Sequence, residues 1–315
     1  MNLVFCGTPQ FAVPTLEALI AAGHHIALVL SQPDKPVGRS GEIHPTPVKQ
    51  AALAHGITVT QPDKLKHNET LQATLREIAP DAIVVVAYGR IIPQWMLDLP
   101  RYGCINGHGS LLPRWRGAAP IQWAIASGDT ETGVTTMLLN AGLDTGPMLL
   151  KRAVPITPHT TSPELFVSLA DIGASLMVET LAGLEQGTIT PQPQDDSLHT
   201  LAPILTRDDA RIDWHRTAAE IDQRFRGFQP WPGSFTTLRG KKLIVHAITF
   251  DPSLRSEAAP GTIHLHGDTL LVACGNNTAL TLGEVQLEGK KRMPAGDFLR
   301  GFQLKTGEVL GEITP

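Results

Sequence analysis

The chain has 315 residues, of which 42% are hydrophobic and 18% are charged. These proportions are typical of a soluble globular protein and exclude wholesale disorder, and the length suggests about two domains. Residues 1–206 hold 12 basic and 17 acidic side chains, a net charge of −5, whereas residues 207–315 hold 14 and 13, a net charge of +1. The total of −4 excludes a uniformly basic nucleic-acid binder, but it leaves room for a local basic surface.

The first part of the chain alternates between short apolar runs and helical patterns. Strands are expected over 2–6, 25–30, 57–60, 81–87, 103–106 and 132–139. Helices are expected over 15–22, 48–55, 71–78, 118–127 and 163–184. Strands that alternate with helices predict βαβ units. We therefore expect residues 1–188 to form an α/β domain with a doubly wound, mostly parallel sheet.

The pattern changes after this domain. Residues 189–206 have little apolar periodicity and are expected to form a linker. Residues 207–315 begin with a helix over 217–228, and short strand-like runs follow at 234–238, 242–250, 261–266, 269–273 and 279–288. Several short strands at this spacing predict a small antiparallel barrel or sandwich.

Several classes of protein are disfavoured by missing patterns. The three cysteines (Cys6, Cys104 and Cys274) are widely spaced without a C-x-x-C pair, which predicts reduced thiols in a cytoplasmic protein. No H-E-x-x-H or C-x-x-C motif indicates a metal, and no glycine-rich motif indicates a nucleotide phosphate. The N-terminus does not have the pattern of a signal peptide, and no apolar run approaches the roughly 20 residues that cross a bilayer.

The stretch from Asn106 to Pro113 is the most informative candidate site. It follows a predicted strand, and open α/β sheets bind ligands at the carboxyl ends of their strands. Asn106 and His108 point to one side of an extended chain, so an amide donor and an imidazole converge there. Asp144 follows the strand over 132–139 and could orient the imidazole. The alternatives are a histidine in an ordinary turn and an aspartate that caps one.

Two further features concern basic residues. Residues 32–49 form a long loop rich in proline and glycine that carries Lys35, Arg39 and Lys49. Loops of this length are often functional, although a mobile surface loop is the alternative. The β-rich part carries two basic clusters, which indicate either a polyanion-binding surface or solvated turns. These clusters are Lys241-Lys242 and Lys290-Lys291-Arg292.

Seven stretches together resemble the formyltetrahydrofolate-dependent formyltransferases, and they cover nearly the whole chain in the order of that family. The stretches are Phe5-x-Gly7-Thr8-Pro9-x-Phe11-Ala12, Gln32-Pro33-Asp34-Lys35-Pro36-x-Gly38-Arg39, Val84-Val85-Val86-Ala87-Tyr88-Gly89, Ser110-Leu111-Leu112-Pro113-Arg114-Trp115-Arg116-Gly117-Ala118-Ala119-Pro120-Ile121-Gln122, Gly142-Leu143-Asp144-Thr145-Gly146, Arg211-Ile212-Asp213-Trp214 and Pro230-Trp231-Pro232-Gly233. The second and fourth stretches are similar to the branch of the family that modifies tRNA.

This resemblance implies a role for each candidate residue. The activity would be transfer of the formyl group of 10-formyltetrahydrofolate to the amino group of methionine on initiator tRNA. Asn106, His108 and Asp144 resemble the catalytic trio, and no metal is implied. The folate would contact Ser110, Leu111, Leu112 and Pro113, and its pterin ring Gly89, Arg90, Ile91, Ile92 and Asn140. The tRNA would contact Lys35, Arg39, Lys49, Lys241, Lys242, Lys290, Lys291 and Arg292. Residues 207–315 resemble an OB-type barrel that helps to hold tRNA, and we expect a monomer without membrane association.

Two positions depart from the family. The loop usually continues Gly-Arg-Gly-Lys-Lys, whereas this chain has Gly38-Arg39-Ser40-Gly41-Glu42 and so lacks two positive charges. Asn140 stands where the family often has aspartate. Two other functions remain open: a formyltransferase for a small amine, such as a sugar nucleotide or glycinamide ribonucleotide, and a non-enzymatic OB-type nucleic-acid-binding protein.

Overall fold

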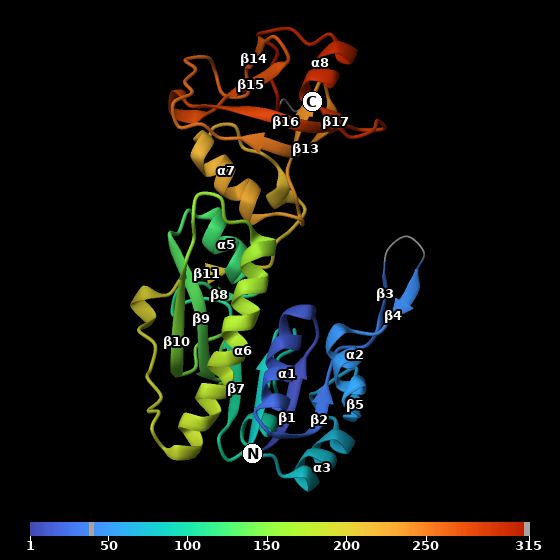
Figure 1. Cartoon of the computed structure of the whole chain (residues 1–315), viewed down its shortest axis with the longest axis vertical. Coiled ribbons are helices and arrows are strands. Elements are labelled where there is room, and N and C mark those ends of the chain that lie inside the picture. The colour runs from blue at the N-terminus through green and yellow to red at the C-terminus, as the bar shows by residue number, and fades with distance from the viewer. Residues whose placement is uncertain (38–40, 312–315) are drawn as a thin grey trace. The chain divides into compact units, whose positions relative to one another are not determined.

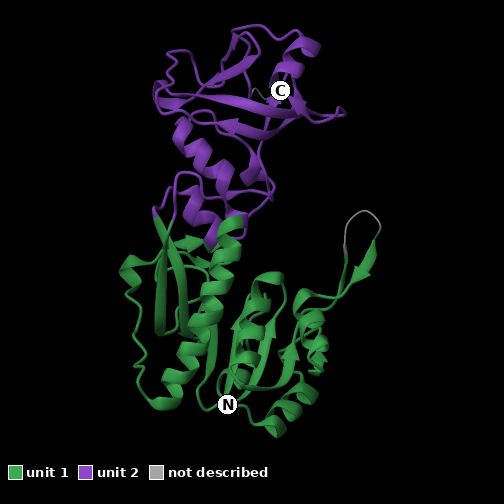
Figure 2. Ribbon diagram, in the orientation of Figure 1, with its two compact units in different colours: residues 1–120, 131–155, 164–203 green, residues 121–130, 156–163, 204–315 purple. Residues whose placement is uncertain are grey.

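The computed structural model describes residues 1–37 and 41–311, and it contains two compact units (Figures 1 and 2). Unit 1 comprises residues 1–120, 131–155 and 164–203. Unit 2 comprises residues 121–130, 156–163 and 204–315.

Unit 1 is built on a seven-stranded sheet with the order β10-β9-β7-β6-β1-β2-β5. The strands are β1 (Asn2–Gly7), β2 (His25–Leu30), β5 (Val59–Thr60), β6 (Ala82–Val86), β7 (Cys104–His108), β9 (Glu131–Leu138) and β10 (Met148–Pro155). Five of them are parallel, whereas β9 is antiparallel to both β7 and β10. The expected α/β sheet is thus present as a mixed sheet with an antiparallel edge, and β10 is a strand that the sequence patterns did not predict.

Helices cover both faces of this sheet, because the side chains of its central strands alternate between two cores. Leu3 and Phe5 of β1 pack into one core, and Val4 and Cys6 pack into the other. The first core is covered by α1 (Val13–Ala21), α2 (Pro47–Ala54) and α6 (Ser162–Gln186), and the second by α3 (Glu69–Ile78) and α4 (Gln94–Leu97). This alternation gives the doubly wound, Rossmann-like arrangement.

Helix α6, expected over 163–184, is long and apolar enough to cross a membrane by length and composition alone, although the sequence has no unbroken apolar run of about 20 residues. It has 25 residues, and an 18-residue window within it reaches a mean hydropathy of 1.6. Charged residues such as Glu164, Asp171 and Glu179 interrupt its apolar run, which is why the sequence alone did not single it out. Met177 and Leu181 are fully buried in the first core, as in the core helix of a globular domain.

Two segments expected to lack regular structure form short strands in unit 1. Within residues 32–49, β3 (Lys35–Val37) and β4 (Glu42–His44) form a hairpin; Arg39 lies outside the described residues. Within the expected linker, Gln192 pairs with Met148, and β11 (Leu201–Ala202) runs parallel to β8 (Arg116–Gly117). Residues 192–202, hereafter the strap, thus belong to unit 1.

Unit 2 contains an antiparallel sheet with the order β12-β13-β16-β15-β14, and β17 pairs with β16. Its strands are β12 (Phe235–Leu238), β13 (Lys241–Thr249), β14 (Ile263–His266), β15 (Thr269–Ala273), β16 (Ala279–Leu287) and β17 (Met293–Pro294). Its helices are α5 (Pro120–Ala126), which begins at the end of unit 1, α7 (Ala218–Gly227) and α8 (Ala295–Phe302). A capping box between Thr217 and Glu220 starts α7.

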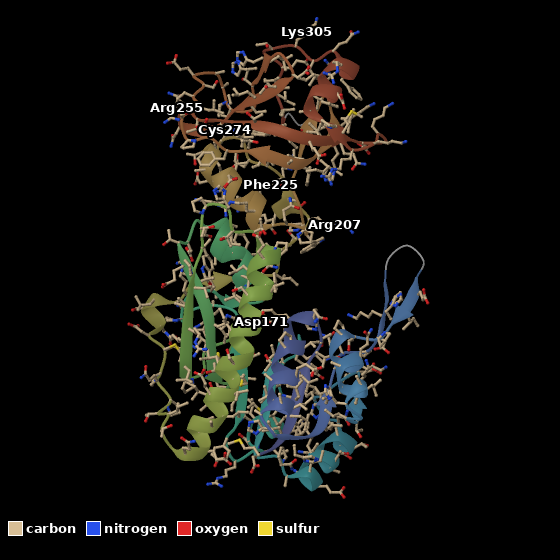
Figure 3. The ribbon with its side chains drawn as sticks, in the orientation of Figure 1. Asp171, Arg207, Phe225, Arg255, Cys274 and Lys305 are labelled. Atoms are coloured by element: carbon tan, nitrogen blue, oxygen red, sulfur yellow. The ribbon has the colours of Figure 1, made fainter. Side chains whose placement is uncertain are left out.

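The core of unit 2 includes the buried Cys274, and Phe225 of α7 packs against it (Figure 3). The expected OB-like barrel is not confirmed, because no strand ladder joins the edge strands β12 and β14 within the described residues. Main-chain hydrogen bonds from residues 308–311 do reach both edges. Ile263 donates to Glu308, and Gly311 donates to Thr237 at 2.9 Å.

Candidate active site

The candidate site lies at the carboxyl end of β7, in the middle of the sheet of unit 1. Asn106 and His108 point to the same face of β7 as Cys104, which is buried in the second core. Gly107 faces the opposite side, where an added Cβ would lie 3.5 Å from Met177 of α6. The predicted convergence of an amide and an imidazole therefore follows from the period of two in this strand.

The structure brings His108 and Asp144 together. The Nδ1 atom of His108 lies 3.7 Å from Oδ2 of Asp144, and the two side chains are only 6% and 14% exposed. The other ring nitrogen, Nε2, donates to the main-chain oxygen of Trp115 at 2.8 Å. A carbonyl oxygen only accepts, so Nε2 carries a hydrogen and Nδ1 of the neutral ring has a free lone pair beside the carboxylate. Nδ1 is thus the ring atom left free to accept a hydrogen bond.

The loop that carries Asp144 has an unusual backbone. Asp144 has a φ of 51°, in the left-handed region that non-glycine residues seldom occupy. Its Oδ2 accepts from the main-chain N–H of Gly117 at 2.9 Å. The side chain of Asn140 accepts from Gly142 at 3.0 Å and from Thr145 at 2.8 Å. Asn140, expected at the pterin pocket, thus also shapes the loop that presents Asp144.

The segment from Ser110 to Pro113 is held in place from β9 and β10. The Thr135 hydroxyl donates to the main-chain oxygen of Ser110 at 2.7 Å and accepts from the N–H of Leu112 at 3.1 Å. The Lys151 ammonium donates to the main-chain oxygen of Leu112, and partial burial lowers the pKa of this lysine. The Leu112–Pro113 peptide bond is cis. The predicted folate segment is therefore a fixed loop beside His108.

The segment from Gly89 to Ile92 follows β6 and lies near the ends of two neighbouring strands. Thr8, after β1, donates through its hydroxyl to the main-chain oxygen of Tyr88 at 3.1 Å. Gln32, after β2, donates through Nε2 to the same oxygen at 2.8 Å. Gly89 has a φ of 74°, and an added Cβ there would lie 2.5 Å from Nε2 of Gln32. The positive φ favours glycine at this position, and the exposed Ile91 lies two residues beyond.

Three buried polar atoms in and near this segment have no hydrogen-bond partner among the described residues. They are the Tyr88 hydroxyl, Nε of Arg90 and the indole nitrogen of Trp95. Burial raises the pKa of Tyr88 well above its ordinary range, which keeps the hydroxyl protonated and able to donate. Buried polar groups usually have partners, so these three atoms are candidates for hydrogen bonds to water or to a ligand.

The predicted tRNA contacts differ in their surroundings. Lys49 is engaged within the protein, since its ammonium contacts Asp34 at 2.5 Å and Gln61 at 2.7 Å. Hydrogen bonds from Lys49 and Gln61 lower the pKa of Asp34. Lys35 lies in the β3–β4 hairpin, and Arg39 lies outside the described residues.

The two basic clusters of unit 2 lie at one end of its sheet. The main-chain N–H of Glu288, which lies just before the second cluster, donates to the main-chain oxygen of Lys242 at 2.9 Å. The ammonium of Lys242 lies 4.0 Å from the centre of the Phe235 ring, and Arg292 pairs with Glu284. Lys241, Lys290 and Lys291 are exposed. The sheet register thus joins two clusters that are about fifty residues apart in sequence.

Three residues at the site were not identified by the sequence patterns: Thr135, Lys151 and Gln194. Gly117 lay within a family stretch, but no role was predicted for it. The side chains of these three residues bond main-chain groups of the site, and such contacts have no sequence motif. Thr135 could have been found, because it lies directly opposite His108 once β9 is paired with β7. No group of three or more histidine, cysteine, aspartate or glutamate side chains that could hold a metal occurs among the residues described.

Comparisons with known proteins identify the family of this chain. Residues 1–181 match the formyl transferase family, and residues 204–303 match the formyl transferase C-terminal domain. The methionyl-tRNA formyltransferase of Acidobacterium capsulatum is 60% identical, over 99% of this chain and all of that protein. The corresponding protein of Koribacter versatilis is 56% identical over the full length of both chains.

Solved structures share the fold at lower identity. The N-formyltransferase of Helicobacter canadensis, in complex with folinic acid and dTDP-3-aminofucose, has a TM-score of 0.66 at 16% identity, over 89% of this chain and 98% of that one. HypX of Aquifex aeolicus, in complex with tetrahydrofolic acid, has a TM-score of 0.59 at 17% identity, over 98% and 48% of the two chains. The family matches and the full-length identities show that this chain belongs to the formyl transferase family, in its methionyl-tRNA formyltransferase branch.

Proposed function

We propose that this chain transfers the formyl group of 10-formyltetrahydrofolate to the amino group of methionyl initiator tRNA. The observation that carries the proposal is the His108–Asp144 pair beside Asn106, in a chain 60% identical to a methionyl-tRNA formyltransferase over its full length. This activity places the protein in translation initiation, and we expect it to act in the cytoplasm as a monomer.

Each member of the trio has a task that its geometry supports. When bound, 10-formyltetrahydrofolate supplies the electrophilic formyl carbon. Asn106 donates to the oxyanion that develops when the methionyl amine attacks this carbon, and a well-placed donor of this kind is worth about 3–4 kcal/mol. Nδ1 of His108, which lies beside Asp144, accepts the amine proton, directly or through water. The tetrahedral intermediate would then collapse with cleavage of the bond between the formyl carbon and N10 of the folate, and N10 would leave with a proton. Asp144 stabilises the imidazolium, and Trp115 fixes the ring from its far side.

The residues near the ends of β6 and β7 suit a folate. A pterin ring is flat and carries several hydrogen-bond donors and acceptors, so it can satisfy buried polar atoms beside an apolar core. The unpartnered atoms of Tyr88, Arg90 and Trp95 provide such partners, and the segment from Ser110 to Pro113 provides a fixed wall close to His108. We therefore assign the pterin to the 89–92 segment and the formyl group to the edge next to His108.

The tRNA is assigned to strands β3 and β4 of the hairpin and to the basic end of the unit 2 sheet. Lys241, Lys290 and Lys291 offer exposed charges to phosphate oxygens, whereas Lys49 supports the base of the hairpin through Asp34. Phosphate contacts of this kind position a nucleic acid without reading its sequence. Unit 2 would thereby act as the platform that the family resemblance assigns to an OB-type domain.

The test is formylation of charged initiator tRNA with 10-formyltetrahydrofolate, compared with sugar-nucleotide and glycinamide ribonucleotide amines. Of these acceptors, we expect only the charged initiator tRNA to be formylated. We also expect kcat to fall about 100-fold or more in Asn106→Ala and in His108→Ala. Thermal unfolding of both variants controls for folding. Preference for a small amine, or near-normal rates in both variants, would refute the assignment. Tight, salt-sensitive tRNA binding without any product would favour the non-enzymatic alternative.

A further inference from the structure

The side chain of Gln194 joins the strap to the loop that carries Asp144, between β9 and β10. Its Nε2 atom donates to two main-chain oxygens of the loop, that of Asp144 at 2.7 Å and that of Gly146 at 2.9 Å. Its Oε1 atom accepts from Nε of Arg116 at 2.9 Å. The amide nitrogen and the amide oxygen of Gln194 therefore link three segments: the loop, β8 and the strap.

The loop needs such a restraint for two reasons. Asp144 is held at a φ of 51°, and backbone in sparsely populated regions persists only where its surroundings hold it. An added Cβ on Gly146 would lie 1.7 Å from the main-chain oxygen of Leu138, so the loop is tightly folded against the end of β9. The two carbonyls bonded by Gln194 flank this turn and fix its orientation.

Gln194 is itself held in place. Arg116 is 5% exposed, and it donates to Gln194 through Nε and to Asp196 of the strap through Nη2 at 2.7 Å. The main chain beside Arg116 is paired with the strap, since the N–H of Arg116 donates to Thr200 at 2.9 Å. The next residue, Gly117, donates to the Asp144 carboxylate. The strap and β8 thus meet Asp144 from two sides, at its carbonyl and at its carboxylate.

From this geometry we propose that Gln194 is a positioning residue for formyl transfer, which sets the position of the Asp144 carboxylate beside His108. Its two hydrogen bonds to the loop go to main-chain oxygens, so it acts through Asp144. The inference rests on the proposed function, because the role of Asp144 does. A misplacement of about 1 Å at a reacting group can lower a rate about 100-fold. We expect its replacement to lower kcat and to leave KM unchanged, since no hydrogen bond of Gln194 reaches the predicted folate or tRNA contacts.

The experiment compares Gln194→Met and Gln194→Glu with wild type and with the control Gln192→Met. Methionine fills a similar volume without donors, whereas glutamate keeps an acceptor for Arg116 and places a charge against two carbonyl oxygens. Gln192 is an exposed glutamine of the same strap that pairs with Met148 through its main chain. We expect kcat to fall about 10- to 100-fold in both Gln194 variants, with the KM of both substrates within about threefold of wild type. Gln192→Met should match wild type.

Thermal unfolding identifies a variant that fails to fold, and the remaining Gln194 variant then decides the test. A kcat within about threefold of wild type in a folded Gln194 variant, or a change confined to KM, would refute the positioning role. A matching loss in Gln192→Met would also refute it, because the effect would then belong to the strap as a whole. An inactive wild type would refute the proposed function and this inference together. An active wild type with unaffected Gln194 variants would refute the inference alone.

Discussion

Strand β9 offers a matched pair of threonines that tests how the segment from Ser110 to Pro113, the predicted folate segment, is held. Thr135 is fully buried, and its hydroxyl bonds the main-chain oxygen of Ser110 and the N–H of Leu112. Thr132 lies three residues earlier and is 2% exposed, and its hydroxyl has no hydrogen-bond partner among the described residues. Replacement by valine removes the same atom in each case. The two variants therefore differ mainly in the partners that the hydroxyl leaves behind.

Thr135→Val should leave a donor and an acceptor of the buried loop unpaired. Each orphaned buried group costs about 1–3 kcal/mol, partly offset by the buried methyl group, so we expect a loss of about 2–3 kcal/mol in the free energy of unfolding. In a domain of this size that corresponds to a fall of roughly 4–12 °C in Tm. Thr132→Val removes a hydroxyl that was buried without a partner, so its change should be near zero or slightly stabilising.

Differential scanning calorimetry and urea unfolding of both variants measure these changes, and the KM for 10-formyltetrahydrofolate reports the folate segment. We expect this KM to rise in Thr135→Val and to stay unchanged in Thr132→Val. Equal stabilities of the two variants, within about 0.5 kcal/mol, would refute the reasoning, because the buried hydrogen bonds of Thr135 would then carry no net energy.

Three further predictions concern charge. Asp144→Asn keeps an acceptor for Gly117 but removes the negative charge beside His108, so kcat should fall about 100-fold or more with folding retained, as steady-state formylation measures. Asp34→Asn should cost about 1–2 kcal/mol at pH 7. Because its hydrogen bonds lower the pKa of Asp34 below 3.8 in the folded protein, the difference from wild type in acid unfolding should shrink below pH 3.8 and be lost as the pH falls through this lowered pKa. Replacing Lys290 and Lys291 together by glutamine should weaken tRNA binding. Filter binding at several salt concentrations should show that the slope of log K against log salt concentration falls by roughly 0.7–0.9 for each phosphate that the variant no longer neutralises. An unchanged slope would show that this end of the sheet does not contact the tRNA.

The central strands could be read from the sequence because they are buried on both faces. All five residues of β6 are buried, and such a strand appears as a continuous apolar run. Strand β10 escaped prediction because it lies at the edge of the sheet, where residues such as Lys151 and Arg152 interrupt its apolar positions. The antiparallel direction of β9 was equally hidden, since apolar alternation is the same in both directions.

The expected linker is a second segment whose structure the sequence patterns did not predict. Residues 192–202 bond to the rest of unit 1 mainly through main-chain groups and through side chains such as those of Gln194 and Thr200. Periodicity detects segments that bury an apolar face, so a segment held by hydrogen bonds is read as unstructured. The hairpin within residues 32–49 was read as a loop for a similar reason, because all three residues of β4 are exposed.

By itself, the sequence determined the local chemistry of this protein. The spacing of Asn106 and His108 on a strand, the glycines beside them and the family motifs all depend on neighbouring residues, and they led to the formyl transferase family. Only the tertiary structure decided what surrounds these groups. Asp144 reaches His108 because the loop after β9 is folded back and held by residues as distant as Gln194. Such contacts depend on strand register and loop closure, and both are set by the packing of the whole unit.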